Sequence, residues 1–378
     1  MTTQRPKVAL VLTGGGARAA YQVGVLAAIR EILPDPHHNP FQILSGASAG
    51  ALNAAVLACW AENFGTGVDH LRRTWTSFHA SDVYRADALG IAGTGARWLS
   101  SLMLGWLVRQ NPHSLLDNSP LRALLERNLD FSRIDQAIAS GALHSLSITC
   151  SGYASGHSVS FFQGHEDLQT WTRTQRFGAR VQLTLDHLMA SSAIPFIFPA
   201  VRINREYFGD GSMRQLAPIS PAVHLGAERV LVIGSGRMSS ENDRVIQESY
   251  PSLAQIAGHA LSSIFLDSMS MDLERLQRIN NTLSLIPDDV KREKGLALRP
   301  IEALVISPSE RLDTLAARHA HVLPWPVRAL LRGIGAMNRR GGALTSYLLF
   351  EPEYTGALID LGYRDTMARK SEVLQFLE

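Results

Sequence analysis

SGASAGALNAA, residues 45–55, fits the pattern G-x-S-x-G, with Ser48 at its centre between Gly46 and Gly50. A serine in this pattern is typical of a nucleophile elbow, where the chain turns sharply from a strand into a helix and exposes the hydroxyl. Small residues are needed on both sides, because a large side chain would clash in so tight a turn. The alternative is a small-residue turn that simply begins a helix. The apolar residues before the turn and the alanine-rich run after it favour the elbow.

The segments around the elbow predict a parallel sheet covered by helices. Residues 7–12 are apolar and rich in β-branched side chains, as in a buried strand, and they lead into the glycines at 14–16. Residues 19–32 follow with the apolar spacing of a helix, which a proline ends. The same order repeats with a strand at 41–44, the elbow, and a helix at 51–62. Two successive strand–turn–helix units imply an α/β fold.

The rest of the chain extends this plan without an internal repeat or a long linker. Its patterns predict, in order, a helical insertion at 68–130, a hairpin of strands at 146–153 and 158–163, a helix at 183–192, strands at 206–208 and 229–234, a helix at 251–280 and a strand at 301–307. The last strand is expected to join the existing sheet. We therefore predict a three-layer α/β/α fold with a central, mostly parallel sheet and a largely helical C-terminal extension.

Composition narrows the classes of function. The 378 residues are 46% hydrophobic, and no stretch approaches the ~20 apolar residues that a membrane-spanning helix needs. A net charge of +2 gives no field that would attract nucleic acid, so no nucleic-acid partner is expected. Cys59 and Cys150 sit among small and apolar neighbours, which indicates buried thiols and not a disulfide or a metal site. We expect neither a metal nor a cofactor.

GGGARAAYQVGVL, residues 14–26, brings three glycines to the end of the first strand. Successive amides of such a loop point into one small concavity, which an oxyanion hole or a phosphate cradle requires. Gly14, Gly16 and Ala19 also fit a degenerate dinucleotide-binding pattern. That site needs an acidic residue at the end of the second strand, whereas Asp35 precedes the strand. The loop is therefore expected to serve the serine.

A nucleophilic serine requires a base. His224 or His259 would complete an ordinary triad, but both lie in segments that read as helical, without a loop around them. Asp210 lies between Gly209 and Gly211 after a short strand, where glycines permit an unusual backbone and close approach to another loop. An ordinary Asp-Gly turn is the alternative explanation of this segment.

Four blocks in order resemble those of the patatin-like phospholipases: GGGARAAYQVGVL at 14–26, SGASAGALNAA at 45–55, ASSAIPFIFP at 190–199 and FGDGSM at 208–213. The resemblance covers about residues 7–236. It implies a patatin-like fold with an acyl hydrolase core at 1–236. Residues 237–378 resemble the C-terminal extension of a bacterial, cytoplasmic subgroup, and we expect them to pack on the same core and to contribute one strand.

The resemblance also implies which residues act. By position, Ser48 is the nucleophile and Asp210 its base, so that a Ser-Asp dyad replaces the usual triad. The oxyanion site is expected from four residues of the glycine loop, Gly14, Gly15, Gly16 and Arg18. Two positions depart from the family's pattern. Ala19 stands where glycine is usual, and Ser212 stands where glycine or alanine is usual.

The function implied by the resemblance is hydrolysis of lipid acyl esters through an acyl-enzyme, of the phospholipase A or lysophospholipase type. The substrate would be a phospholipid or another fatty-acyl ester. A thioesterase or acyltransferase with the same nucleophile stays open, as does a catalytically silent module that binds lipid or a nucleotide. We expect a cytoplasmic protein. Peripheral contact with the inner membrane face and a homodimeric state are left open.

Two amphipathic segments bear on lipid access. In residues 94–108, Trp98, Met103 and Trp106 belong to an apolar helical stripe, which predicts either a substrate-binding lid or acyl pocket, or plain core packing. In residues 327–340, arginines gather on one side of a helix and apolar residues on the other. A solvated face over a buried stripe explains this second segment better than a membrane-surface helix.

Overall fold

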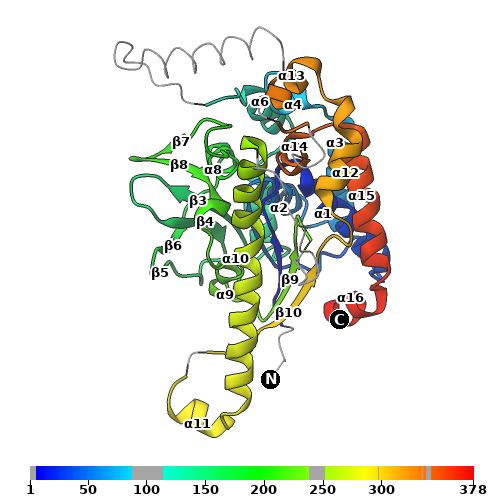
Figure 1. The fold of residues 1–378 in the computed structure, drawn as a ribbon. Coiled ribbons are helices and arrows are strands. Elements are labelled where there is room, and N and C mark those ends of the chain that lie inside the picture. Colours follow the sequence, from blue (N-terminus) through cyan, green and yellow to red (C-terminus); the bar gives the residue numbers. More distant parts are fainter. Residues whose placement is uncertain (1–5, 87–113, 238–251, 297, 334, 338–341) are drawn as a thin grey trace.

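The structure is a computed structural model, and it describes residues 6–86, 114–237, 252–296, 298–333, 335–337 and 342–378 (Figure 1). The stripe with Trp98, Met103 and Trp106 lies outside the described residues, as does part of 327–340. The described helix of the latter segment, α13 (Trp325–Gly333), buries Leu331 and exposes Arg332. That is the arrangement of a solvated face over a buried stripe.

Among the described residues, five parallel strands form the centre of the sheet, in the order β10-β9-β1-β2-β3 (Figure 1). They are β1 (Val8–Leu12), β2 (Ile43–Ala47), β3 (Ser145–Gly152), β9 (Arg229–Ile233) and β10 (Glu302–Ile306). Every residue of β1, β2 and β3 is buried, as expected for parallel strands with helices on both faces. The mostly parallel sheet is as predicted, and β10 pairs with β9.

β2 ends later than the sequence predicts. The predicted strand ends at residue 44, but β2 continues to Ala47, and Gly46 and Ala47 pair with Ile148 and Thr149 of β3. These small residues carry no strand signal of their own. Pairing with β3 keeps them extended up to the elbow.

Five further strands extend the sheet beyond β3, and their pairs are antiparallel except that β4 and β6 run parallel. They are β4 (Ser158–Gly164), β5 (Trp171–Arg173), β6 (Arg176–Arg180), β7 (Val201–Ile203) and β8 (Glu206–Asp210). The predicted β3–β4 hairpin is confirmed. The sequence did not predict β5, β6 or β7, because strands of three to five residues with few buried side chains carry little apolar alternation.

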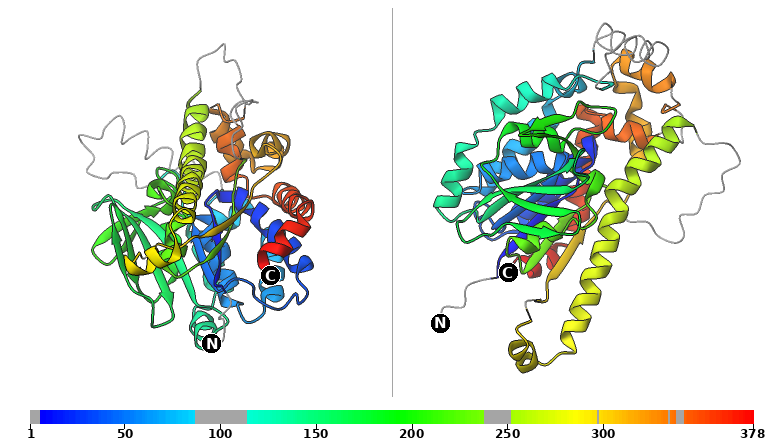
Figure 2. Two further views of the ribbon diagram at one scale, coloured as in Figure 1. Left: turned by 90° about the horizontal axis from the view of Figure 1, so that it is seen from below. Right: turned by 90° about the vertical axis from the view of Figure 1, so that its left-hand side faces the viewer.

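Helices cover both faces of the sheet, in the three layers that the sequence predicts. Side chains of β1 alternate between the faces: Leu10 and Leu12 belong to one buried cluster, and Ala9 and Val11 to the other. The first cluster includes residues of α1 (Ala20–Ile32), α2 (Ala49–Cys59), α3 (Phe64–Ser77) and α15 (Pro352–Met367). The second includes residues of α9 (Ser220–His224) and α10 (Leu253–Ser284), whose length Figure 2 shows in yellow-green.

Shorter helices complete the described chain. They are η1 (Gly16–Ala19), α4 (Ala80–Val83), α6 (Ser119–Asn128), α7 (Ser132–Ala139), α8 (Leu185–Ser191), η2 (Gly211–Arg214), α11 (Asp288–Glu293), α12 (Leu312–His319), η3 (Ala320–Val322), α14 (Gly342–Leu348) and α16 (Lys370–Leu377). None of the described helices is both long and apolar enough to span a bilayer.

The C-terminal helix α15 packs directly on α1. The two helices approach closely at two glycines: a Cβ on Gly24 would lie 1.9 Å from Ile359 O, and one on Gly362 would lie 2.2 Å from Tyr21 O. The Tyr21 hydroxyl also donates to Asp365 Oδ2 at 3.0 Å. The C-terminal region therefore shares its packing with the first helix of the chain, and a division at residue 236 stays a prediction.

Candidate active site

Ser48 lies at the turn between β2 and α2, the position of a nucleophile elbow. Its φ is +54°, a conformation that costs a non-glycine residue about 1–3 kcal/mol. Glycines make the turn possible: a Cβ on Gly46 would lie 2.6 Å from Ala51 Cα, and one on Gly50 would lie 2.3 Å from Leu12 O. The strained serine is thus held in place by the packing around it.

β3 aligns the elbow with Asp210. Ala47 of β2 lies opposite Thr149, and Asp210, the last residue of β8, lies opposite the next residue, Cys150. β4 occupies the other edge of β3 at these positions, so β8 takes over where β2 leaves the sheet. Gly211 permits the approach, because a Cβ there would lie 1.9 Å from Thr149 O. Two loops far apart in the sequence become neighbours in this way.

The Asp210 carboxylate is buried, with 1% of the residue exposed. Its Oδ1 accepts a hydrogen bond from the Ser212 amide at 2.9 Å, whereas Oδ2 is buried without a partner among the described residues. Burial raises the pKa of Asp210 to about 6, and nearby Ser48 and Ser212 limit the rise. The Ser48 hydroxyl is close enough to favour the charged carboxylate but falls short of a standard hydrogen bond to Oδ2. A carboxylate of this kind suits a general base.

The block 190–199 supports both residues. The Ser48 amide donates to Ser191 Oγ at 2.9 Å, and the Ser191 hydroxyl donates to Thr149 O at 2.6 Å. The Asp210 amide donates to Ala193 O at 2.9 Å. Sequence reasoning identified the block only through the family resemblance, and it missed the role of Ser191. A serine among other small residues carries no signal for such a bridge.

The glycine loop lies beside the elbow, since Gly50 contacts the main chain at the end of β1. The Ser235 hydroxyl donates to Gly14 O, and a Cβ on Gly15 would lie 2.5 Å from Ser235 Cβ. Within the described chain, the amides of Gly14 and Gly15 donate no main-chain hydrogen bond. Gly16 lines the same cavity as Ser48. The loop can thus offer amides to a ligand.

A row of buried amide side chains ties this loop to α2 and α3. Gln22 Nε2 donates to Thr13 O at 2.8 Å, and Asn53 Nδ2 donates to Gln22 Oε1 at 2.9 Å. Trp75 Nε1 then donates to Asn53 Oδ1 at 2.8 Å. Buried polar groups that are paired in this way fix the elements that carry them. The sequence analysis did not identify these residues. The available signal was a single amide side chain among small and apolar residues, Gln22 in the block 14–26 and Asn53 in the block 45–55.

An apolar cavity of about 70 Å³ adjoins Ser48. Its walls come from α2, α3 and α6, with contributions from the loop after α8 and from Phe350. The lining includes Leu52, Val56, Leu71, Trp75, Phe78, Leu121, Leu125, Leu129, Ile194, Phe198 and Phe350. A cavity of this character suits a hydrocarbon chain better than a nucleotide.

Three residues considered from the sequence lie elsewhere. The Arg18 guanidinium is directed to α14, where its Nε donates to Ser346 Oγ at 2.7 Å. His224 stacks on Trp171 at 4.9 Å, and burial lowers its pKa to about 4, with further lowering by nearby arginines. His259 is exposed on α10. Neither histidine lines the cavity that contains Ser48.

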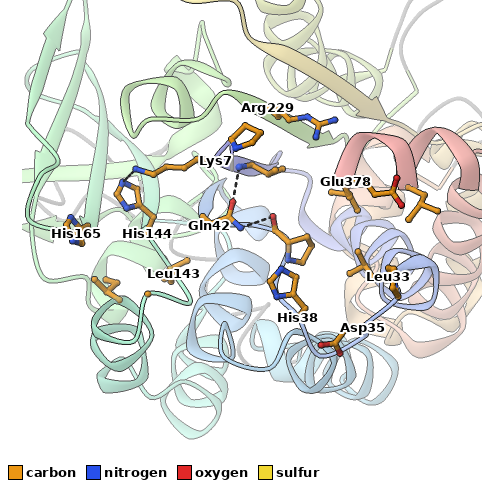
Figure 3. Close-up of a pocket in the computed structure, with 18 of the residues that line it drawn as sticks. Lys7, Leu33, Asp35, His38, Gln42, Leu143, His144, His165, Arg229 and Glu378 are labelled. Carbon is orange, nitrogen blue, oxygen red and sulfur yellow. Dashed lines mark hydrogen bonds between the residues drawn. The ribbon is translucent and has the colours of Figure 1, made fainter. Parts of the chain in front are cut away.

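A larger hollow of about 720 Å³ lies where β1 and β9 begin (Figure 3). Lys7 and Arg229 line it together with His144, and Figure 3 shows Lys7 reaching toward His144. His144, His165 and Asp167 could offer a metal three ligand atoms within 4.8 Å of one another. However, Lys7 Nζ lies 3.2 Å from His144 Nε2, where its positive charge opposes a cation. The described residues that line the hollow include no serine, threonine or cysteine, so its size does not make it the site of a serine nucleophile.

One family model and several solved structures are similar to this chain. The family model described as patatin-like phospholipase matches residues 10–223. VipD from Legionella pneumophila is 14% identical over 94% of this chain and 67% of that one, with a TM-score of 0.34. Human GIVD cytosolic phospholipase A2 is 12% identical over 98% of this chain and 60% of that one, with a TM-score of 0.47. The chain thus spans about three fifths of the human structure. No curated protein matches it.

The family assignment rests on the family model. Its match covers more than half of the chain and contains all four sequence blocks, from the glycine loop to the segment around Asp210. The chain therefore belongs to the patatin-like phospholipase family of lipid hydrolases.

Proposed function

We propose that the chain hydrolyses the fatty-acyl ester bond of a phospholipid or lysophospholipid, with Ser48 as nucleophile and Asp210 as base. The observation that carries the proposal is the combination of a strained serine and a buried carboxylate of raised pKa beside an apolar cavity. Perturbed groups of this kind cluster at catalytic sites.

The reaction proceeds in two steps. Asp210 accepts the proton of the Ser48 hydroxyl as Oγ attacks the ester carbonyl carbon, and the carbonyl oxygen becomes an oxyanion. When this tetrahedral intermediate collapses, the alcohol leaves with the proton from Asp210, and an acyl-enzyme remains. Asp210 then accepts a proton from water, which attacks the acyl carbon. Ser48 leaves with that proton, and the fatty acid is released.

The oxyanion is stabilised by the amides of the glycine loop and by the N-terminus of α2. The amides of Gly14 and Gly15 have no main-chain acceptor in the part of the chain that the structure describes, and Gly16 lines the cavity with Ser48. α2 begins at the residue after Ser48, so its dipole also favours negative charge there. Removal of one such donor typically costs about 10²–10³ in kcat.

The apolar cavity supports a fatty-acyl substrate. A fatty-acyl chain would bury its methylenes there, each contributing about 0.8 kcal/mol. A nucleotide would instead need groups that hold phosphate, and the described residues that line the cavity include no lysine or arginine. Transient contact with a membrane surface follows from a phospholipid substrate and is part of the proposal.

Ester and phospholipid hydrolysis by purified variants tests the proposal. Ser48→Ala should lower kcat/KM by more than about 10³-fold, because no other group forms the acyl-enzyme. Asp210→Asn should also lose hydrolysis, because the amide cannot accept the proton. A panel of matched oxygen esters and thioesters, assayed with and without an added alcohol, identifies the leaving group and the acyl acceptor.

Ser145→Ala is the matched control. Ser145 is a fully buried serine at the start of β3, and its hydroxyl has no hydrogen-bond partner among the described residues. This variant should keep wild-type activity. Full ester hydrolysis by folded Ser48→Ala would overturn the proposal.

A further inference from the structure

The side chain of Arg18 joins the glycine loop to the C-terminal region. Arg18 is 5% exposed, and its Nε and Nη1 donate to Ser346 Oγ at 2.7 Å and to Tyr347 Oη at 3.2 Å. The guanidinium carbon also lies 4.0 Å from the centre of the Tyr347 ring. Both partners belong to α14, which lies more than 320 positions further along the chain. One short helix thus binds a residue two positions beyond the last loop glycine.

α14 touches the loop a second time, at Gly16 itself. Gly16 has a φ of +54°, and a Cβ there would lie 2.3 Å from Tyr347 O. The chain then continues to Phe350, which lines the cavity with Ser48. The main chain of α14 therefore contacts the loop at Gly16, and the side chains of α14 contact the nearby Arg18.

The glycine loop needs such a support. Glycines lose more conformational freedom on folding than other residues, so three in succession do not hold a fixed geometry by themselves. Ser235 restrains Gly14 from one side. The contacts of Arg18 and Gly16 with α14 restrain the other end of the same loop.

We propose that Arg18 is a positioning residue of the active site, which anchors on α14 and so holds the loop amides in the geometry that the oxyanion requires. The inference rests on the proposed function, because the loop's part in catalysis belongs to that proposal. In this proposal the C-terminal region contributes to catalysis by positioning the loop, although α14 supplies no nucleophile or base.

The contact is specific to an arginine. The planar guanidinium presents several donors in a fixed fork and stacks on an aromatic ring, whereas a lysine ammonium is a compact, strongly hydrated charge. Arg18→Lys would keep the positive charge and lose this geometry. Because a misplacement of about 1 Å can cost about 10²-fold in rate, even a small shift of the loop should be measurable.

The double variant Ser346→Ala/Tyr347→Phe tests the inference, since it leaves the loop and Arg18 unchanged. We expect kcat to fall about 10- to 100-fold with little change in KM. A thionoester should be slowed less than its oxygen analogue, because sulfur accepts hydrogen bonds poorly and already forgoes oxyanion stabilisation. Hydrogen exchange of the peptide covering residues 13–19 should become faster. Wild-type kcat together with unchanged exchange would overturn the inference.

The double variant Ser309→Ala/Tyr363→Phe is the matched control. It removes the same two kinds of hydroxyl from the C-terminal region, but these bind Asp365 at 2.6 Å and Glu31 at 2.8 Å, away from the glycine loop. The control should keep wild-type kcat and wild-type exchange at residues 13–19. Equal losses of kcat in both double variants would reveal a general loss of stability and overturn the inference.

Two further measurements distinguish failure of this inference from misfolding of the variant and from failure of the proposed function. If the α14 double variant does not fold, Tyr347→Phe alone removes the 3.2 Å contact, keeps the contact of Arg18 with Ser346, and should show a smaller loss of kcat. If wild-type protein hydrolyses no ester, the proposed function fails. The exchange measurement still decides whether α14 orders the loop.

Discussion

The chemistry of Asp210 follows from where its two oxygens lie. One is held by the Ser212 amide, and the other is buried without a partner among the described residues. Burial therefore penalises the charged carboxylate more than nearby Ser48 and Ser212 stabilise it, and the pKa rises to about 6. A base of this pKa is ionised at neutral pH and still has a useful proton affinity.

The pH dependence of kcat/KM should report this pKa. Protonated Asp210 cannot accept the proton of Ser48, so kcat/KM should rise through an apparent pKa of about 6 and level off above it. The acidic limb of the pH profile can be measured with a soluble ester whose leaving group does not titrate, assayed from about pH 4 to about pH 8. A limb near 3.8, the ordinary value for aspartate, would show that Asp210 is not the raised base.

Asp210 should also make the stability of the protein depend on pH. The native state keeps the Asp210 proton up to about pH 6, whereas the unfolded chain releases it near 3.8. The native state thus binds more protons between these values, and the free energy of unfolding falls by about 3 kcal/mol as pH rises through them. Asp210→Asn removes this loss. Relative to wild type, the variant should gain that amount between about pH 4 and about pH 8 in urea unfolding, and a constant difference would contradict the assignment.

At the scale of elements, α2 begins directly after the turn at Ser48 and forms one wall of the cavity. Leu52 and Val56 are four residues apart on α2, so they lie along one side of the helix, and both line the cavity together with Ser48, which directly precedes the helix. Val56 lies seven residues beyond Ala49, the first residue of α2, and so about 10 Å further along the helix axis. The position of a side chain on α2 therefore corresponds to a distance along the acyl chain.

Val56→Trp should shorten the acyl chain that the enzyme accepts. The larger side chain fills the cavity beyond Leu52, so kcat/KM for long-chain esters should fall at least about 10-fold, while short-chain esters change little. Val56→Ala is the matched control, and it should preserve or favour the longer chains. Chain-length profiles with p-nitrophenyl esters measure both. Equal losses for short and long chains in Val56→Trp would contradict the cavity's role.

Local patterns in the sequence predicted the elements that form the site. They did not predict how strands far apart in the sequence pair with one another. β1 and the elbow were predicted because their apolar runs and glycines act within a few residues. The contact of β8 with Cys150, which brings Asp210 to the elbow, depends on where β2 leaves β3. The family resemblance could pair Ser48 with Asp210, but the register that does so is visible only in the fold.

At the scale of the whole molecule, the C-terminal region packs on the sheet and helices that contain the four sequence blocks. β10 adds to the sheet beside β9, α15 crosses α1 at Gly24 and Gly362, and α14 holds Arg18. The sequence predicted the added strand. It could not reveal that Arg18 binds α14, because no local pattern links an arginine to a helix so far along the chain.

A fragment of residues 1–236 should not reach the native state. Without the C-terminal region, the close glycine contact of α1 and the buried guanidinium of Arg18 would lose their partners. We expect the fragment to lack near-ultraviolet circular dichroism and a cooperative urea transition, both of which the full chain should show. A cooperative transition in the fragment, with fluorophosphonate labelling of Ser48, would show that the core is an independent domain.

Labelling with a fluorophosphonate, followed by mass spectrometry of the modified peptides, tests most directly whether Ser48 is the nucleophile that Asp210 activates. We expect a single adduct, on Ser48, whose formation slows sharply in Asp210→Asn and keeps its wild-type rate in Ser145→Ala. An adduct on a different residue, or undiminished ester hydrolysis by folded protein that lacks the Ser48 hydroxyl, would contradict this assignment.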